Sequence, residues 1–177
     1  MPRNRQQVDR EDKIEEILDA AKRVLRSGGY DALSFKQIAD ELGLARGALY
    51  WYFPSKDDLF VAAAASAFND ALSRPPVRAG YARRISWAVE RLAELQPINL
   101  ALHDRARHSD AAAQLEQTIQ EQMCARLRDV LHPHVDPSRV DVVAQTIVVF
   151  VQGLLSLPLT PAERSRNLSF LLDELVR

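Results

Sequence analysis

The chain has 177 residues, which is long enough to bury a sizeable core in one or two small domains. Its formal net charge is −1, so it lacks an overall basic excess, and any cationic surface for a polyanionic partner must be local. The single cysteine, Cys124, excludes an intramolecular disulfide and fits a reducing cytoplasm. Residues 1–9 are polar, which argues against a signal peptide. The sequence has no run of about 18 apolar residues, which argues against a membrane span.

The first predicted helix covers Arg10 to Ser27 and ends at Gly28-Gly29. Apolar residues recur along it at helical spacing and predict one buried face: Ile14, Ile17, Leu18, Ala21 and Leu25. Four acidic residues lie near its start, where they favour the helix dipole: Glu11, Asp12, Glu15 and Glu16. The polar segment before this helix carries Arg3 and Arg5, which predicts a basic N-terminal arm.

The second predicted helix is short and ends at a glycine. Ser34 is a suitable N-cap, because its hydroxyl can accept a hydrogen bond from an unpaired backbone N–H. The following apolar residues give one buried face: Phe35, Ile38, Ala39 and Leu42. Gly43 then allows the chain to leave the helix through a left-handed conformation.

A third predicted helix runs from about Arg46 to Phe53 and stops at Pro54. Leu49 and Phe53 are four residues apart and should face inward. Ser55, followed three residues later by Asp58, resembles a capping box that begins the next helix. Two short helices joined at a tight turn have the layout of a helix-turn-helix, whose second helix enters the major groove of DNA.

The outward side of the third helix carries residue types that suit DNA. Arginine binds guanine bidentately, glycine permits close approach, and tyrosine hydroxyls and lysine reach phosphates. Trp51 lies between two tyrosines, and we expect it to pack in the core instead. The predicted DNA-binding residues are Lys36, Arg46, Gly47, Ala48, Tyr50, Tyr52 and Lys56, together with Arg3 and Arg5.

The remainder of the sequence also predicts helices, with no alternating strand pattern and no internal repeat. The predicted segments cover about Asp57–Ser73, Arg78–Leu95, Ile98–His108, Asp110–Leu131, Ser138–Leu157 and Ala162–Val176. Proline-containing loops separate several of them, and Asp110 is the expected cap of the longest. The fold class is therefore all-α, with about nine helices.

Residues 14–60 resemble the TetR family of ligand-responsive transcription regulators. The resemblance rests on six groups of residues: Ile17-Leu18-Asp19-Ala20-Ala21, Gly29-Tyr30, Ser34-Phe35 with Ile38-Ala39, Leu42-Gly43-Leu44, Gly47-Ala48-Leu49-Tyr50, and Tyr52-Phe53-Pro54-Ser55-Lys56-Asp57-Asp58-Leu59. It implies a helix-turn-helix domain over residues 1–56 and a helical effector-binding and dimerisation domain over 57–177. Ala45 replaces the usual Ser or Thr cap, and Tyr52 replaces a more common His, so both positions bear on operator affinity.

The family resemblance implies a homodimer that binds a palindromic operator in double-stranded DNA. The segment around residues 142–155 is apolar nearly all round, and a helix of that kind must be covered on more than one side. The predicted interface comprises Val143, Ile147, Val151, Leu154, Leu168, Leu171, Leu172 and Leu175. The same residues would also suit the core of a monomer.

The resemblance also implies a small, mostly apolar effector bound among the middle helices. Candidate lining residues are Trp87, Leu95, His103, Met123 and Phe150, each of which would equally suit the core. The favoured function is a repressor that the effector releases from DNA. An activator with the same DNA-binding module, and a helical interaction or carrier protein that has lost DNA binding, are the alternatives.

Enzymatic chemistry finds no support in the sequence. There is no phosphate-binding loop, dinucleotide fingerprint or zinc-protease helix. His132 and His134 flank Pro133 with no cysteine or second histidine pair nearby, which argues against a metal site. Cys124 has no neighbour that marks it as a nucleophile, and a small apolar role is expected. We therefore expect neither a cofactor nor a membrane partner.

Overall fold

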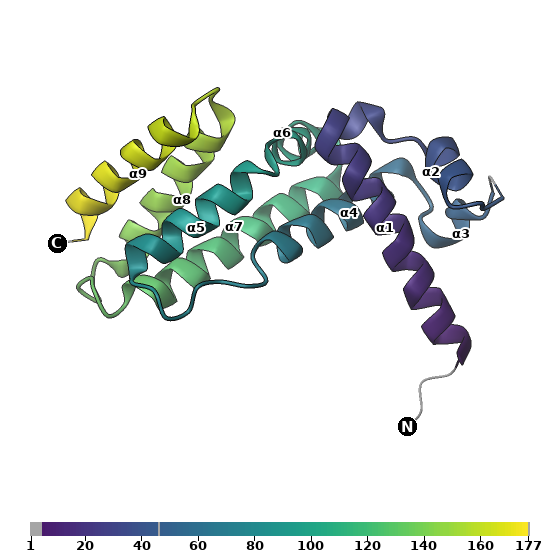
Figure 1. The fold of residues 1–177 in the computed structure, drawn as a ribbon. Coiled ribbons are helices and arrows are strands. Elements are labelled where there is room, and N and C mark those ends of the chain that lie inside the picture. The colour runs from purple at the N-terminus through teal and green to yellow at the C-terminus, as the bar shows by residue number, and fades with distance from the viewer. Residues whose placement is uncertain (1–4, 46, 177) are drawn as a thin grey trace. The chain divides into compact units, whose positions relative to one another are not determined.

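The computed structural model describes residues 5–45 and 47–176, and every regular element within them is a helix (Figure 1). The described helices are α1 (Arg5–Ala32), α2 (Phe35–Glu41), α3 (Leu49–Tyr52), α4 (Lys56–Ala71), α5 (Tyr81–Ala93), α6 (Gln96–Arg105), α7 (Asp110–Leu131), α8 (Val140–Ser156) and α9 (Pro161–Leu175). The predicted all-α fold of about nine helices is confirmed. None of the helices in these described ranges is long and apolar enough to cross a bilayer.

The chain forms two compact units. The N-terminal unit comprises the described residues up to Asn69 together with Pro97–Leu115, and the C-terminal unit comprises Asp70–Gln96 and the described residues from Glu116 onward. The division falls within the residue ranges of α4 and α7, so each of these helices contributes to both units. A functional boundary near residue 56 remains a prediction.

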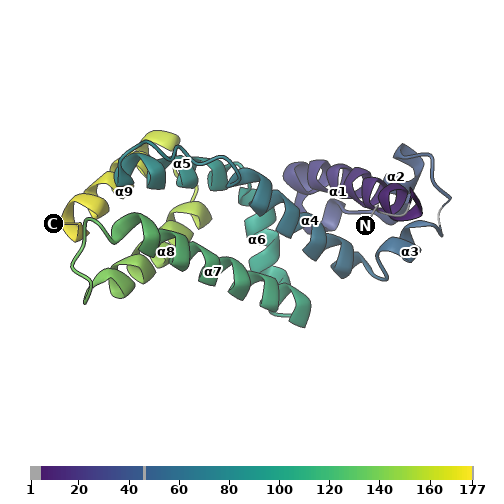
Figure 2. The ribbon, with the colours of Figure 1, turned by 90° about the horizontal axis from the view of Figure 1, so that it is seen from below.

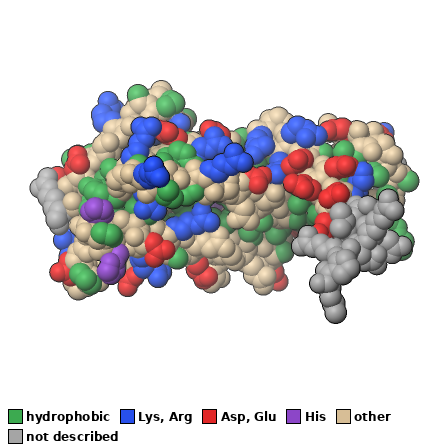
Figure 3. Space-filling view, turned by 60° about the horizontal axis from the view of Figure 1, so that its bottom comes forward, with side chains coloured by type: hydrophobic (Ala, Val, Ile, Leu, Met, Phe, Trp, Pro, Cys, Tyr) green, Lys and Arg blue, Asp and Glu red, His purple; other side chains and the backbone are tan. Residues whose placement is uncertain are grey.

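In the N-terminal unit, the predicted inward faces of α1 and α2 pack together. Ile17, Leu25 and Ile38 are fully buried, and an ion pair between Arg23 and Glu41 joins the two helices at the surface. Gly29 breaks the helical geometry near the end of α1 with a φ of 63°. The four predicted dipole-stabilising acids do not lie in the first turn, because α1 begins at Arg5 rather than Arg10. On the face shown in Figure 3, several acidic side chains lie close together.

In the C-terminal unit, α5, α8 and α9 pack against one another (Figure 2). Thr160 caps α9 in a capping box with Glu163, a signal that the sequence analysis did not use. Two other helix starts differ from prediction. The side chain of Ser109, rather than Asp110, caps α7, and α5 begins three residues later than Arg78 because Gly80 is extended.

The residues predicted for the dimer interface mostly form the interior of this unit. Six of them are at most 4% exposed within the single chain: Val143, Ile147, Val151, Leu154, Leu168 and Leu172. Leu171 and Leu175 are half-buried. The apolar circumference of α8 is therefore covered largely by α5 and α9, as in the monomer-core alternative. The large apolar side chains left exposed on these helices are Val142, Val149 and Phe170.

Candidate nucleic-acid interface and effector cavity

The turn between α2 and α3 is built by local hydrogen bonds. The Ser34 hydroxyl accepts from the backbone N–H of Gln37 at 3.4 Å, which confirms the predicted cap. Gly43 adopts a φ of 64°, a conformation that glycine reaches without steric cost. The backbone N–H of Leu44 then donates to the carbonyl of Ala39 at 2.9 Å, which returns the chain toward α2. The turn therefore follows directly from residue types at fixed positions.

The third helix is shorter than predicted and presents two aromatic rings to solvent. Leu49 is fully buried and Phe53 is 7% exposed, as their spacing predicts. Tyr50 is 57% exposed and Trp51 is 86% exposed, so the expectation that Trp51 packs in the core is wrong. A residue two positions after Leu49 lies about 200° around the helix from it, on the opposite side. The Tyr50 ring rests 4.8 Å from the Phe35 ring, centroid to centroid.

The other predicted DNA-binding residues occupy several environments. Lys36 and Gly47 are exposed, and a Cβ built on Gly47 would meet no atom within 4 Å. The half-buried members of the set are Ala48, Tyr52 and Lys56. Three predicted residues lie outside what the structure describes: Arg3, Arg46 and the side chain of Arg5. Ala45 provides no side-chain cap, and Ala48, at the start of α3, provides none either.

A side-chain cap holds the start of α4, just after α3. The backbone N–H of Asp58 donates to the Ser55 hydroxyl at 3.1 Å, and that hydroxyl donates to the Asp58 carboxylate at 2.7 Å. The predicted capping residues are therefore correct, although the carboxylate here accepts from the hydroxyl. The helix α4 begins at Lys56. Its first turn contains Asp57 and Asp58, whose negative charges interact favourably with the helix dipole.

A cluster within the N-terminal unit joins α4 to α1 and α6. The Tyr30 hydroxyl donates to Asp57 at 2.5 Å, and the Arg105 guanidinium donates to the other oxygen of the same carboxylate at 2.7 Å. Two cations, Lys56 and Arg105, also contact the face of the Tyr30 ring. Lys56 Nζ lies 4.3 Å and Arg105 Cζ lies 4.6 Å from the ring centroid. Phe60 contacts the ring edge-on at 5.2 Å. We call Tyr30, Lys56, Asp57 and Arg105 the Tyr30 cluster.

The protonation of this cluster follows from its contacts. Burial, the hydrogen bond to Asp57 and the negative charge of Asp57 together raise the pKa of Tyr30 to about 12. Burial favours a higher pKa for Asp57, but hydrogen bonds from Tyr30 and Arg105 and the Arg105 charge outweigh it, so the carboxyl pKa lies below its usual range. At neutral pH the cluster therefore holds an ionised Asp57 beside a neutral phenol.

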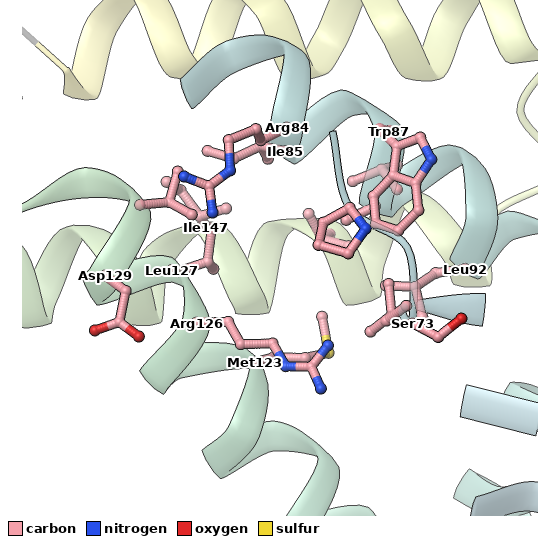
Figure 4. Close-up of a pocket in the computed structure, with 16 residues that line it drawn as sticks. Ser73, Arg84, Ile85, Trp87, Leu92, Met123, Arg126, Leu127, Asp129 and Ile147 are labelled. Atoms are coloured by element: carbon pink, nitrogen blue, oxygen red, sulfur yellow. The ribbon is translucent and has the colours of Figure 1, made fainter. Parts of the chain in front are cut away.

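The C-terminal unit contains a cavity of about 410 Å³ between α5, α7 and α8 (Figure 4). Its wall is mostly apolar, and residues at positions i, i+3, i+4 and i+7 supply much of it from α5 and from α7: Ile85, Ala88, Val89 and Leu92, and Met123, Arg126, Leu127 and Val130. Ile147 and Val151 of α8 complete the apolar wall. The charged lining residues are Arg84, Arg126 and Asp129. We call this space the α5–α7–α8 cavity.

Comparison with known proteins points to one family. The sequence profile described as "Bacterial regulatory proteins, tetR family" matches residues 17–63, the segment that forms the capped helices above. The HTH-type transcriptional repressor KstR of Rhodococcus jostii is 43% identical over 65 residues, and that of Mycobacterium tuberculosis is 43% identical over 53 residues. Residues 17–63 therefore match the N-terminal segment of the tetR family of bacterial regulatory proteins. The matches cover 35% and 30% of this chain but only 31% and 24% of those relatives, respectively.

Solved structures extend the likeness to the whole TetR fold. A transcriptional regulator from Rhodococcus sp. Rha1 superposes with a TM-score of 0.78 at 20% identity, over 92% of this chain and 95% of that one. A putative regulator from Saccharomonospora viridis, solved in complex with choline, gives a TM-score of 0.71 at 18% identity, over 92% and 96% of the two chains. At these identities the likeness concerns the fold alone.

The structure brings together two of the five residues predicted for a TetR effector site. Trp87 and Met123 line the α5–α7–α8 cavity. Leu95 is 2% exposed in the core, Phe150 is half-buried on α8, and His103 is exposed in the other unit, so these three do not line it. The sequence analysis missed Arg84 and Arg126, although Arg126 shares a helical stripe with Met123 and Leu127.

Metal and thiol chemistry have no visible centre in the described part of the chain. No group of three or more His, Cys, Asp or Glu side chains there could hold a metal ion. His134 instead packs against the Tyr81 ring at 4.8 Å between centroids. Cys124 is half-buried on α7.

Proposed function

We propose that this protein is a sequence-specific DNA-binding transcription regulator that acts in the cytoplasm. The observation that carries the proposal is the two-residue aromatic surface of α3, where Tyr50 and Trp51 are 57% and 86% exposed beside a capped α4. Large apolar side chains exposed on a recognition helix lose water when they enter a groove. The family profile and the names of the partial relatives support the same function.

The predicted contacts divide into two roles. Arg46, Gly47 and Ala48 would approach base edges, as would Trp51, whose ring can contact a thymine methyl. Lys36, Tyr50, Tyr52 and Lys56 would bind phosphates and fix the register on the duplex. The N-terminus of α4 adds backbone N–H groups with a favourable dipole for a phosphate next to Lys56. Arg3 and Arg5 remain proposed as a basic arm.

We also propose a homodimer, because one short recognition helix reads few base pairs whereas two on a twofold axis read a palindrome. The surface of α8 and α9 still supports this pairing, although most of the residues predicted for it are buried. Val142 and Val149 are each 63% exposed and lie seven residues apart on one side of α8, and Phe170 of α9 is 69% exposed. These three residues replace the earlier set as the proposed interface.

The favoured mode of regulation is a repressor that an effector releases from DNA. The effector site would be the α5–α7–α8 cavity, and α4 would carry the signal, since Leu72 just after it lines the cavity while Lys56 begins it. Within the N-terminal unit, Arg105 of α6 is bonded to Asp57 in the first turn of α4. A shift of α4 would thus disturb a bonded network next to the recognition helix. Coupling of this kind is typically about 1–3 kcal/mol.

Selection of random duplex DNA by the purified protein, followed by sequencing, tests the function. A palindromic consensus is the expected result. The absence of any enriched sequence, from protein with native helical content and oligomeric state, would favour the interaction or carrier alternative. A reporter driven by the selected sequence would then separate repression from activation, because only a repressor lowers expression when it is added.

A further inference from the structure

The α5–α7–α8 cavity holds a cation whose hydrogen bonds are incomplete. Arg84 is half-buried on the cavity wall, and its Nε is buried without a hydrogen-bond partner among the described residues. Figure 4 shows its guanidinium directed from α5 toward Leu127 on α7. Asp129 also lines the cavity, but no ion pair joins it to Arg84 in the described part of the chain. The wall therefore carries an arginine without an acidic partner.

An arginine without an acidic partner indicates which kind of ligand the α5–α7–α8 cavity would bind. A guanidinium on a mostly apolar wall that has no carboxylate partner is poorly compensated, and an anionic ligand supplies the missing acceptor. Arginine donors form a planar fork that matches a carboxylate, and such charge-assisted bonds are among the strongest in proteins. The rest of the wall offers mainly aliphatic side chains with the Trp87 ring.

We propose that the α5–α7–α8 cavity binds an amphipathic carboxylic acid. Its carboxylate would accept hydrogen bonds from Arg84, with Arg126 as a second cation on the wall, and its apolar body would lie against α5, α7 and α8. The cavity volume of about 410 Å³ is near the lower end of the range for ligand sites, so the acid must be small. The inference rests on the proposed function only in naming this acid as the effector.

A cationic ligand is the main alternative, because a tryptophan face also attracts quaternary ammonium groups. The choline complex of the Saccharomonospora viridis neighbour shows that a protein of this fold can hold such a cation. Here, however, the wall carries two arginines against one aspartate, and the electrostatic balance opposes a positive ligand. The sign of the ligand charge is therefore the property to test.

Trp87 provides a direct reporter, because Trp51 is the only other tryptophan and can be replaced by phenylalanine. In the W51F protein, fluorescence titration with decanoate, 1-decanol and decyltrimethylammonium compares three head groups on one apolar tail. We expect decanoate to bind about tenfold or more tightly than the other two. Equal binding of decanoate and decanol, tighter binding of the cation, or no binding of decanoate would each overturn the proposal.

Arg84→Gln and Arg83→Gln form a matched pair on α5, since Arg83 is exposed and does not line the cavity. The first should weaken decanoate binding about tenfold or more and leave decanol unchanged, while the second should change neither. A preference for decanoate that survives in Arg84→Gln contradicts the assignment. Because Arg84→Gln removes a half-buried cation, its helical content is measured alongside, and Arg84→Lys, which keeps the charge without the fork, should bind decanoate with intermediate strength.

Failure of this inference is distinguishable from failure of the proposed function. DNA selection with the wild-type protein tests regulation, whereas the fluorescence titration needs no DNA. A protein that enriches a palindrome but binds no decanoate overturns only the ligand assignment. A protein that binds decanoate through Arg84 but enriches no DNA sequence overturns only the proposed function as a transcription regulator.

Discussion

The two units differ in whether a partly buried arginine has an acidic partner. In the N-terminal unit, Arg105 and Asp57 are bonded to each other, and Lys56 rests on the Tyr30 ring. In the C-terminal unit, Arg84 lines a cavity and has no ion pair among the described residues, although the buried Nε atoms of both arginines lack a hydrogen-bond partner. A bonded network fixes a surface in advance for a partner of constant shape, such as the DNA backbone. An arginine without an acidic partner in an apolar cavity can instead be paired by a bound ligand.

The comparisons with relatives follow the same division. The family profile covers residues 17–63, which lie in the N-terminal unit, and the KstR matches extend over no more than 35% of the chain. Solved structures cover more than 90% of the chain at about 20% identity or less. The helices of the C-terminal unit are thus shared as an arrangement with proteins of low overall sequence identity.

The largest expected effect belongs to the N-terminal surface. Tyr50→Ala should reduce binding to the selected operator by about 10³-fold or more, because the residue is lost from both half-sites. Fluorescence anisotropy with labelled operator measures the loss, and helical content and dimer mass serve as controls. Unchanged affinity in a folded dimer would remove Tyr50 from the interface.

A charge on the exposed face of α8 should break the dimer. Val149→Lys places two like charges in an apolar interface and should raise the dimer dissociation constant about 100-fold or more. Val77→Lys is the matched control, since Val77 is 71% exposed in the loop before α5. Analytical ultracentrifugation measures both variants. If neither variant dissociates the dimer, or if both dissociate it equally, Val149 is not an interface residue.

Removal of either charge in the Tyr30 cluster should destabilise the N-terminal unit. Asp57→Asn and Arg105→Gln should each lower the free energy of unfolding by about 1–3 kcal/mol, because the remaining partner loses a charge-assisted hydrogen bond. The double variant should cost less than the sum of the two, and urea denaturation of all four proteins measures this coupling. Strict additivity would mean that the contact contributes nothing to stability.

The raised pKa of Tyr30 predicts a loss of stability in alkali. The folded protein holds the phenol proton up to a pKa of about 12, above the ordinary value of 10.0. The stabilisation is therefore complete below about pH 10 and is lost as the pH rises through about 12. Urea midpoints across this range should fall more steeply for the wild type than for Tyr30→Phe. Parallel curves would show that folding leaves the pKa of the Tyr30 phenol unchanged.

The smallest effect concerns a single phosphate contact. Lys56→Gln should weaken binding to all DNA sequences about equally and reduce the slope of log affinity against log salt by about 0.9 for each half-site. Lys13→Gln is a suitable control, because Lys13 pairs with Glu16 on α1 and is not among the predicted contacts. A loss that depends on the DNA sequence would instead make Lys56 a base reader.

Sequence reasoning succeeded where structure is local. The Ser34 cap, the Gly43 turn and the inward Leu49 and Phe53 each depend on residues within four positions of one another, so spacing alone predicts them. Trp51 was within reach of the same argument, since it lies about opposite Leu49 on the helix. The prediction failed because an apolar residue type was given more weight than its position.

Contacts between distant residues were decided by the tertiary structure. Arg105 lies 48 residues from Asp57 in the sequence, and no local pattern shows that the two meet. The cavity likewise exists because α5, α7 and α8 leave space between their apolar stripes, which is a property of packing rather than of any one helix. Similarly, α8 read alone suits a dimer interface as well as a core. Its packing against α5 and α9 buries most of the residues predicted for an interface and leaves Val142 and Val149 exposed, because only the assembled fold determines which apolar side chains are covered.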